Sequence, residues 1–147
     1  MSLTDRDRRR LAGVHPDIVR VVERAAREGG VRFIVTEGLR TMDRQSELVR
    51  AGKSQTMRSR HLTGHAVDLA VLDDAGAARW DKPAYVTLAA AVKAAAKAEG
   101  VTLEWGGDWK AFFDGPHFQL PWATYPAAPS AGGNPQPASP APRPAPP

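Results

Sequence analysis

The fold is decided by S-R-H-L-T-G-H-A-V-D, residues 59–68, because this stretch must bend. It places two metal-ligating side chains, His61 and Asp68, on either side of Gly64. Residues seven positions apart are separated by about 23 Å in a straight strand and by about 10 Å in a helix. Two ligands of one zinc ion each lie about 2 Å from it. If both side chains bind one ion, the chain bends between them, and Gly64 permits this because it has no Cβ to clash at positive φ.

The residues that follow the bend alternate as in a β-strand. Over residues 66–71 the larger apolar side chains fall on one face of an extended segment. Asp68 falls on the opposite face, between two alanines. We therefore expect its carboxylate to project from a face that small side chains keep clear.

A third metal ligand is expected far downstream, in the stretch D-G-P-H-F-Q, residues 114–119. His117 completes a set of two histidines and one aspartate. Asp114 lies three residues earlier and supplies a carboxylate that need not bind the metal. Three protein ligands leave the fourth position of a tetrahedral zinc open to water, which is the arrangement of catalytic rather than structural sites. This pattern indicates a hydrolase.

These motifs resemble those of a known family of zinc peptidases. The pattern S-x-H-x-x-G-x-A-x-D over residues 59–68, followed by D-x-x-H over residues 114–117, is similar to that of the D-alanyl-D-alanine carboxypeptidases and dipeptidases and the phage L-alanyl-D-glutamate endopeptidases. The stretches L-A-G-V-H-P (11–16) and E-G-L-R-T (37–41), together with aspartate rather than glutamate at 114, favour the phage endolysin branch. The resemblance covers residues 11–120.

The resemblance implies a Zn²⁺ cofactor held by His61, Asp68 and His117, and a reaction that cleaves the L-alanyl-D-glutamate bond of peptidoglycan stem peptides. A second carboxylate beside the ion can take a proton from water and return it to the leaving amine, and we assign this role to Asp114. Arg40 follows a predicted strand at a turn, and family members carry an arginine in this context. We therefore expect it to stabilise the oxyanion, with a structural ion pair as the alternative.

Three further residues are candidates for substrate binding, namely Ser59, Trp105 and Trp109. Ser59 lies two residues before the first expected metal ligand, and a purely local role in the turn is its alternative. The two tryptophans would give the groove flat apolar walls, or they would pack in the core. Glu104 is a rival for the general base. His15 and His65 are interpreted as structural.

Periodicity and capping residues predict an α+β fold, a small, mostly antiparallel sheet with helices packed on one side, resembling the D-Ala-D-Ala metallopeptidase (hedgehog-like) fold. Helices are expected over residues 3–11, 16–28, 41–50 and 84–99, and strands over residues 31–36, 66–72, 101–105 and 117–120. Ten of the thirteen prolines lie from Pro121 onward. We therefore expect a catalytic domain over residues 1–120 and a disordered Pro/Ala-rich tail over residues 121–147.

Composition restricts the setting of the protein. The 147 residues include no cysteine, so imidazole and carboxylate must hold any metal. The net charge of +4 is compatible with binding to an anionic polymer, or it reflects an ordinary basic surface. The sequence lacks the interleaved basic and aromatic residues that would indicate binding to nucleic acid. Neither a signal peptide nor a membrane span is visible, so we expect the protein to stay in the host cytosol. The resemblance implies that a separate holin then gives it access to the wall. We expect a monomer.

Two alternatives to the endopeptidase remain open from the sequence. A D-alanyl-D-alanine carboxypeptidase would use the same metal site. A wall-binding protein without catalytic activity would keep the metal for its structure. The carboxylate of Asp114 argues against the second alternative, because a binding module has no use for a spare carboxylate beside a metal.

Overall fold

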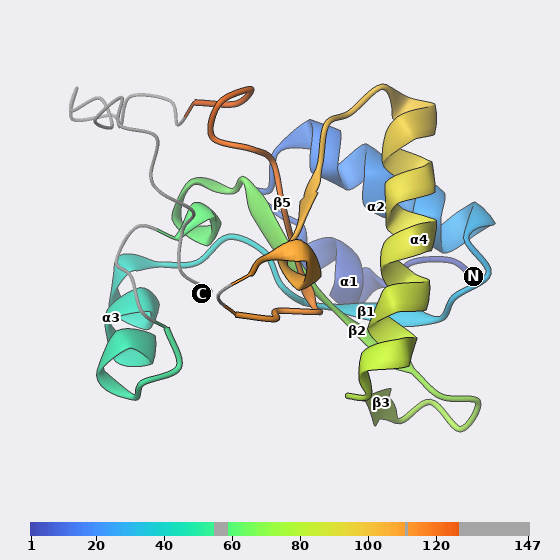
Figure 1. Ribbon diagram of the computed structural model, residues 1–147, viewed down its shortest axis with the longest axis horizontal. Coiled ribbons are helices and arrows are strands. Elements are labelled where there is room, and N and C mark those ends of the chain that lie inside the picture. Colours follow the sequence, from blue (N-terminus) through green and yellow to red (C-terminus); the bar gives the residue numbers. More distant parts are fainter. Residues whose placement is uncertain (55–58, 111, 127–147) are drawn as a thin grey trace.

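The computed structural model describes residues 1–54, 59–110 and 112–126, which form an antiparallel sheet with helices against it (Figure 1). The five strands of this part of the chain follow the order β1-β2-β5-β4, and β3 pairs with β2. Their bounds are Phe33–Glu37 (β1), Ala66–Leu72 (β2), Ala78–Arg79 (β3), Glu104–Trp105 (β4) and His117–Gln119 (β5). The central pair, β2 and β5, carries two of the predicted metal ligands.

The helices begin where the sequence offers a capping side chain. They comprise Asp5–Arg10 (α1), Pro16–Glu28 (α2), Met42–Arg50 (α3) and Lys82–Glu99 (α4), with 3₁₀ turns at Arg60–Thr63 (η1) and Gly106–Asp108 (η2). Thr4, Thr41 and Asp81 each accept a backbone N–H at the start of a helix. The cap at Asp81 starts α4 at Lys82, two residues earlier than predicted.

The core lies between one face of the sheet and the helices α2 and α4. Val67, Leu69 and Val71 belong to this core, whereas Asp68 lies on the opposite face of β2 between the buried alanines Ala66 and Ala70. The predicted alternation along β2 is therefore confirmed. In Figure 1, α3 lies apart from α2 and α4, on the same side of the view as η1. The site thus lies on the face of the sheet that the core helices leave free.

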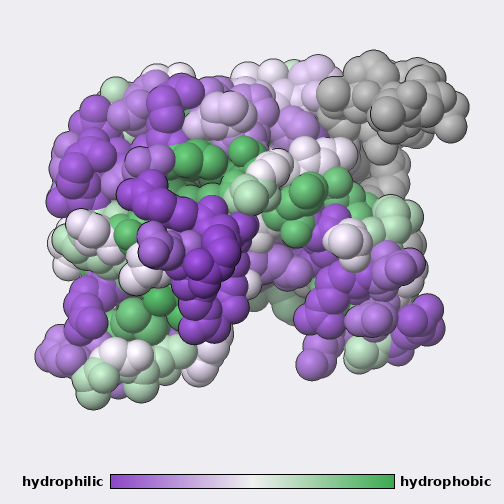
Figure 2. Space-filling view, turned by 180° about the vertical axis from the view of Figure 1, so that it is seen from behind, coloured by the Kyte–Doolittle hydropathy of each residue, from purple (hydrophilic) through white to green (hydrophobic). Residues whose placement is uncertain are grey.

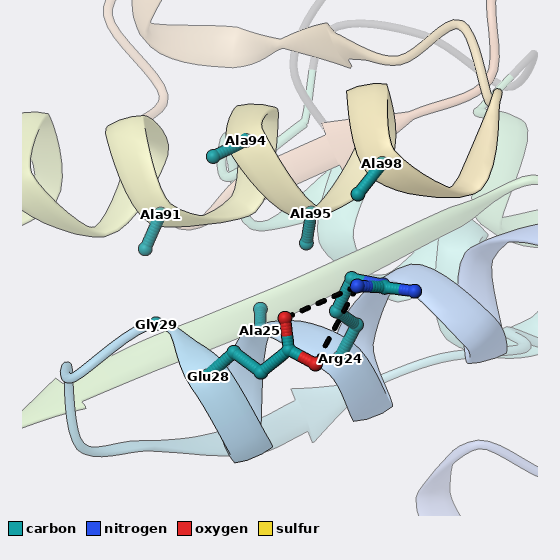
Figure 3. Close-up of a pocket in the computed structure, with 8 residues that line it drawn as sticks. All are labelled: Arg24, Ala25, Glu28, Gly29, Ala91, Ala94, Ala95 and Ala98. Atoms are coloured by element: carbon teal, nitrogen blue, oxygen red, sulfur yellow. Dashed lines mark hydrogen bonds and ion pairs between the residues drawn. The ribbon is translucent and has the colours of Figure 1, made fainter.

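Helices α2 and α4 approach each other closely because alanines line their contact. A hollow between them is lined by Ala25, by alanines of α4 and by the ion pair of Arg24 with Glu28 (Figure 3). Arg24 also donates from Nε to Glu99, at 2.6 Å, and so joins the two helices at the end of α4. Alanine favours the helical conformation of α4, and its small side chain allows α4 to pack closely against α2.

Two features of the sheet were not predicted from the sequence. The strand expected over residues 101–105 pairs only at Glu104 and Trp105, because Val101 instead turns into the core. The register between β1 and β2 shifts between Val35 and Glu37, so that Glu37 pairs with Asp68. This irregularity brings a second acidic side chain to the site.

The face of the molecule turned away from the viewer in Figure 1 is mostly hydrophilic, with hydrophobic residues in patches between hydrophilic ones (Figure 2). Within the described ranges, no helix combines the length and apolar character needed to cross a bilayer.

Residues 121–126 continue beyond β5 and pack on the domain, where the Tyr125 hydroxyl donates to Asp17 at 2.6 Å. The rest of the predicted tail, residues 127–147, lies outside the described residues.

Candidate metal centre

The bend predicted at Gly64 is present and is built by local contacts. The Ser59 hydroxyl accepts the backbone N–H of His61 at 3.1 Å and starts the 3₁₀ turn η1. Gly64 ends this turn with φ +76°, in the left-handed region. A Cβ at Gly64 would lie 2.2 Å from the carbonyl oxygen of Gly13, so no other residue fits here without a shift of the backbone. His61 therefore turns back towards β2.

The three residues predicted as metal ligands come together. Asp68 and His117 are direct partners in the β2–β5 register. The Oδ1 atom of Asp68 lies 3.2 Å from Nε2 of His61 and 3.2 Å from Nδ1 of His117. The three ligand atoms lie within 4.8 Å of one another, and both imidazoles are buried. The geometry is that of a group able to hold one cation.

The outer nitrogens of the two imidazoles show which atoms face the centre. Nδ1 of His61 lies 2.8 Å from the carbonyl oxygen of Gly38, and Nε2 of His117 lies 2.7 Å from Oε1 of Gln119. Both partners are acceptors, so both outer nitrogens carry the proton in the neutral rings. The inner nitrogens face the Asp68 carboxylate: in a neutral ring each can offer a lone pair to an ion, whereas in a charged ring it donates a hydrogen bond to Asp68. Three electron-rich atoms in one place fit a cation between them.

The charge state of Asp68 agrees with this arrangement. Burial acts to raise the pKa of Asp68, but the charge of His61 and hydrogen bonds from both imidazoles outweigh it. The pKa of Asp68 therefore lies well below its ordinary value, and the side chain is a carboxylate across the neutral range. Two imidazoles and a carboxylate suit zinc and several other divalent transition metals.

Asp114 lies beside the three ligands. The turn at residues 114–117 is closed by the N–H of His117, which donates to the Asp114 carbonyl at 3.2 Å. A Cβ at Gly106 would lie 2.9 Å from Cβ of Asp114 and 3.2 Å from Cβ of His117, so the missing side chain of Gly106 makes room for both. Burial raises the pKa of Asp114 to about 6, and Asp68 adds to this effect, whereas His117 and Arg40 oppose it. Asp114 is therefore poised to exchange a proton near neutral pH.

Arg40 is buried next to Asp68 and is held by neighbouring side chains. Its Nη2 forms an ion pair with Glu37 and lies 3.8 Å from Oδ2 of Asp68. Its Nη1 donates to Gln45 at 2.8 Å and reaches Ser59 at 3.5 Å. The structural ion pair left open by the sequence thus exists, and it fixes the guanidinium on the side of Asp68 away from the imidazoles.

The predicted substrate-binding residues lie near the centre but are largely enclosed. Ser59 is 3% exposed, and Trp105 and Trp109 are each 7% exposed. The Trp105 indole belongs to the core and donates to the carbonyl of Gly115 at 2.8 Å. The Trp109 ring centroid lies 5.1 Å from that of His117. Any contact of these residues with a substrate is therefore confined to the edges of their side chains.

Glu104, the rival base in the sequence, faces Gln119 and Trp109. Its Oε1 accepts from Nε2 of Gln119 at 3.2 Å and from Nε1 of Trp109 at 3.0 Å. Neither Gln119 nor Glu37 was predicted as a site residue from the sequence, although both carried a signal. Gln119 shares a strand face with His117 two residues away, and Glu37 precedes Arg40 by three residues.

His15 and His65 lie together away from the metal ligands. Their ring centroids are 5.5 Å apart, and Nδ1 of His65 lies 2.7 Å from the Thr63 hydroxyl. Nδ1 of His15 accepts the N–H of Asp17 and caps α2. Both residues make contacts of the structural kind expected from the sequence.

The chain is similar to proteins of known name. A family model described as phage L-alanyl-D-glutamate peptidase matches residues 1–120. The L-alanyl-D-glutamate peptidase of Listeria phage A118 is 40% identical over 100 residues, which cover 65% of this chain and 33% of that protein. The enzyme of the same name from Escherichia phage T5 is 31% identical over 121 residues, covering 80% of this chain and 87% of its relative. The chain thus spans only a third of the Listeria phage protein.

One solved structure is similar along nearly its whole length. The crystal structure of the Serratia marcescens L-Ala D-Glu endopeptidase ChiX superposes with a TM-score of 0.81 at 54% sequence identity, covering 86% of this chain and 95% of that one. The α+β fold predicted from the sequence is therefore confirmed.

Proposed function

The chain belongs to the phage L-alanyl-D-glutamate peptidase family, and from this we propose that it is a metal-dependent peptidase that cleaves the L-alanyl-D-glutamate bond of peptidoglycan stem peptides. The observation that carries the proposal is the convergence of His61, Asp68 and His117, with Asp114 beside them. A binding module would need the first three residues at most, whereas hydrolysis also needs a group that moves protons.

We assign the metal to His61, Asp68 and His117 and propose that it is Zn²⁺. Such an ion, when bound, lowers the pKa of water and polarises a peptide carbonyl. The protein supplies neutral imidazoles whose outer protons are committed to Gly38 and Gln119. It also supplies one buried carboxylate, so that a divalent ion leaves a net charge of +1 in the centre.

Asp114 is the general base and then the general acid in this proposal. As a carboxylate it takes a proton from the attacking water, and as a carboxylic acid it returns that proton to the amine of the leaving D-glutamyl residue. A pKa of about 6 in the metal-free protein lies close enough to neutrality for both directions, and a bound cation would lower it. Proton transfer of this kind contributes about 10²-fold to 10⁴-fold to rates.

Arg40 is the proposed partner of the oxyanion that forms at the attacked carbonyl. Glu37 and Gln45 hold its guanidinium, so little side-chain freedom is lost when the substrate binds. A donor fixed in advance stabilises developing charge more than a mobile one does. Ser59, Trp105 and Trp109 are proposed to border the substrate through their exposed edges. In a phage setting the enzyme would act as an endolysin, as a monomer, once a holin opens the way to the wall.

The test is digestion of purified peptidoglycan by the native protein and by Asp114→Ala, with metal content measured on both. We expect new D-glutamyl amines by mass spectrometry for the native protein. We also expect the variant to keep its metal and release none. Release of free D-alanine instead would identify a D-alanyl-D-alanine carboxypeptidase. Wall binding by the metal-loaded native protein without new termini would overturn the catalytic proposal.

A further inference from the structure

His117 is held from behind by a buried side-chain amide. Gln119 lies two residues further along β5, on the same strand face, and is 1% exposed. Its Oε1 lies 2.7 Å from Nε2 of His117. An amide can present either its oxygen or its NH₂ group to a neighbour, and these two ends have opposite hydrogen-bonding character.

The orientation of this amide decides which nitrogen of His117 has a free lone pair. With the oxygen towards the ring, Nε2 of the neutral imidazole keeps the proton, and Nδ1 can offer a lone pair to an ion that Asp68 also binds. With the NH₂ group towards the ring, Nε2 would have to accept, and the proton would move to Nδ1. A proton on Nδ1 occupies the position that a metal needs.

Glu104 determines the orientation. The β4–β5 register pairs Glu104 with Gln119, and Nε2 of Gln119 donates to Oε1 of Glu104 at 3.2 Å. A carboxylate accepts and does not donate, so it selects the NH₂ end of the amide. The indole N–H of Trp109, which can only donate, reaches the same oxygen at 3.0 Å and holds it in place. A reversed amide would set oxygen against oxygen at Glu104.

We propose that Glu104 and Gln119 are positioning residues that select the tautomer of His117 with its proton on Nε2, and so raise the affinity of the centre for its metal. This inference rests on the metal site of the proposed function. It concerns metal binding rather than peptide cleavage, and it gives Glu104 a role other than the general base that the sequence left open.

The test compares Glu104→Met with Glu104→Gln in full-length protein. Methionine is similar in length and removes the acceptor, whereas glutamine can place an oxygen at the same position and is the matched control. Zn²⁺ affinity is measured by competition with a chelator. The tautomers of His117 and His61 are read from ¹⁵N chemical shifts of the metal-free protein, at a pH where both rings are neutral. His61 serves as the internal reference because its outer nitrogen faces the backbone carbonyl of Gly38.

We expect Glu104→Met to lose about 10-fold to 100-fold in Zn²⁺ affinity, as is common when a partner behind a metal ligand is lost. The proton of His117 should then be shared between its two nitrogens, while that of His61 stays on Nδ1. Glu104→Gln should keep both native tautomers and an affinity close to that of the native protein. Unchanged affinity and an unchanged His117 tautomer in Glu104→Met would overturn the proposal.

The native protein provides a test that does not depend on the folding of any variant. At a pH where the ring is neutral, the metal-free native protein must keep the proton of His117 on Nε2 although Asp68 offers a competing acceptor to Nδ1, and a proton on Nδ1 would overturn the inference. Neither readout involves peptidoglycan. If wall digestion fails and the tautomer still shifts in Glu104→Met, the proposed function falls and the positioning role stands.

Discussion

The two imidazoles of the centre are held by different means. His61 lies on a 3₁₀ turn, and a backbone carbonyl, Gly38, accepts its outer proton. His117 lies in a strand, and a side chain, Gln119, accepts its outer proton. We call the parts of the centre around these two residues the His61 half and the His117 half. The His61 half is sensitive to changes in the course of the main chain, whereas the His117 half is sensitive to changes of polar side chains. Asp68 joins the halves, because one of its oxygens faces both rings.

The largest effect is expected where the two halves meet. Asp68→Ala removes the carboxylate that both imidazoles face, and two neutral rings bind a divalent ion far more weakly than the complete set. Wall digestion should fall to the level of native protein treated with a chelator, and metal analysis should find the variant metal-free after dialysis. Full metal content in Asp68→Ala would contradict the ligand assignment.

Asp114→Asn tests the His117 half without removing a ligand. We expect wall digestion to fall by about 10²-fold to 10⁴-fold with metal content unchanged. The metal-free variant should also be more stable than metal-free native protein at neutral pH. Burial raises the pKa of Asp114 from 3.8 to about 6, so ionising it destabilises the folded state.

The sign of this stability effect gives the test a second measurement. The cost of ionisation is absent below about pH 4, grows as the pH rises from 4 to 6, and is fully present above pH 6. Melting temperatures of the two metal-free proteins should therefore differ at pH 8 by more than at pH 3.5. An equal difference at both values would show that burial does not raise the pKa of Asp114.

Arg40→Lys tests the side of Asp68 that faces away from the two imidazoles. Lysine keeps the charge but cannot reach Glu37, Gln45 and the substrate at once, because it lacks the planar fork of donors. We expect kcat to fall by about 10²-fold, corresponding to about 3 kcal/mol of transition-state stabilisation, with metal affinity nearly unchanged. Arg44→Lys is the control, because Arg44 forms an exposed pair with Glu47. A loss in metal affinity equal to the loss in kcat would assign Arg40 a structural role.

Gly64→Ala tests the main-chain dependence of the His61 half. The added Cβ would lie 2.2 Å from the Gly13 carbonyl oxygen, in addition to the strain of positive φ. A left-handed conformation alone costs a non-glycine residue about 1–2 kcal/mol. Urea unfolding should show a loss of at least this size. Gly52→Ala is the control, since Gly52 also has positive φ but its added Cβ would meet no atom of the described residues within 4 Å. Equal losses in the two variants would show that the contact with Gly13 is unimportant.

The smallest effect is expected at His65, close to the turn that carries His61. Burial, together with the charges of Arg60 and His15, lowers the pKa of His65 to about 4. The folded state therefore favours the neutral ring, and stability is lost as the pH falls from about 6.5 to 4. His65→Gln should flatten the decline in melting temperature over this range. An unaltered pH profile would place this acid sensitivity elsewhere.

The parts of the site that were predictable depend on short-range patterns. Gly64 between two ligands requires a bend, and alternation along 66–71 separates Asp68 from the core, so both features follow from neighbouring residues. The orientation of the Gln119 amide was not predictable, because it depends on pairing between β4 and β5. The bulge that sets Glu37 opposite Asp68 likewise depends on the register of two distant strands. Motifs identify ligands more readily than the groups that orient them.

The two oxygens of Asp68 face different neighbours, since Oδ1 meets both imidazoles and Oδ2 lies 3.8 Å from Nη2 of Arg40. When a cation draws electron density from one oxygen, the guanidinium beside the other experiences a weaker negative field. The ¹⁵N resonances of Arg40 should therefore report whether the ion is bound, even though this arginine is not a ligand. Occupancy could then be followed during turnover with an isotopic label alone.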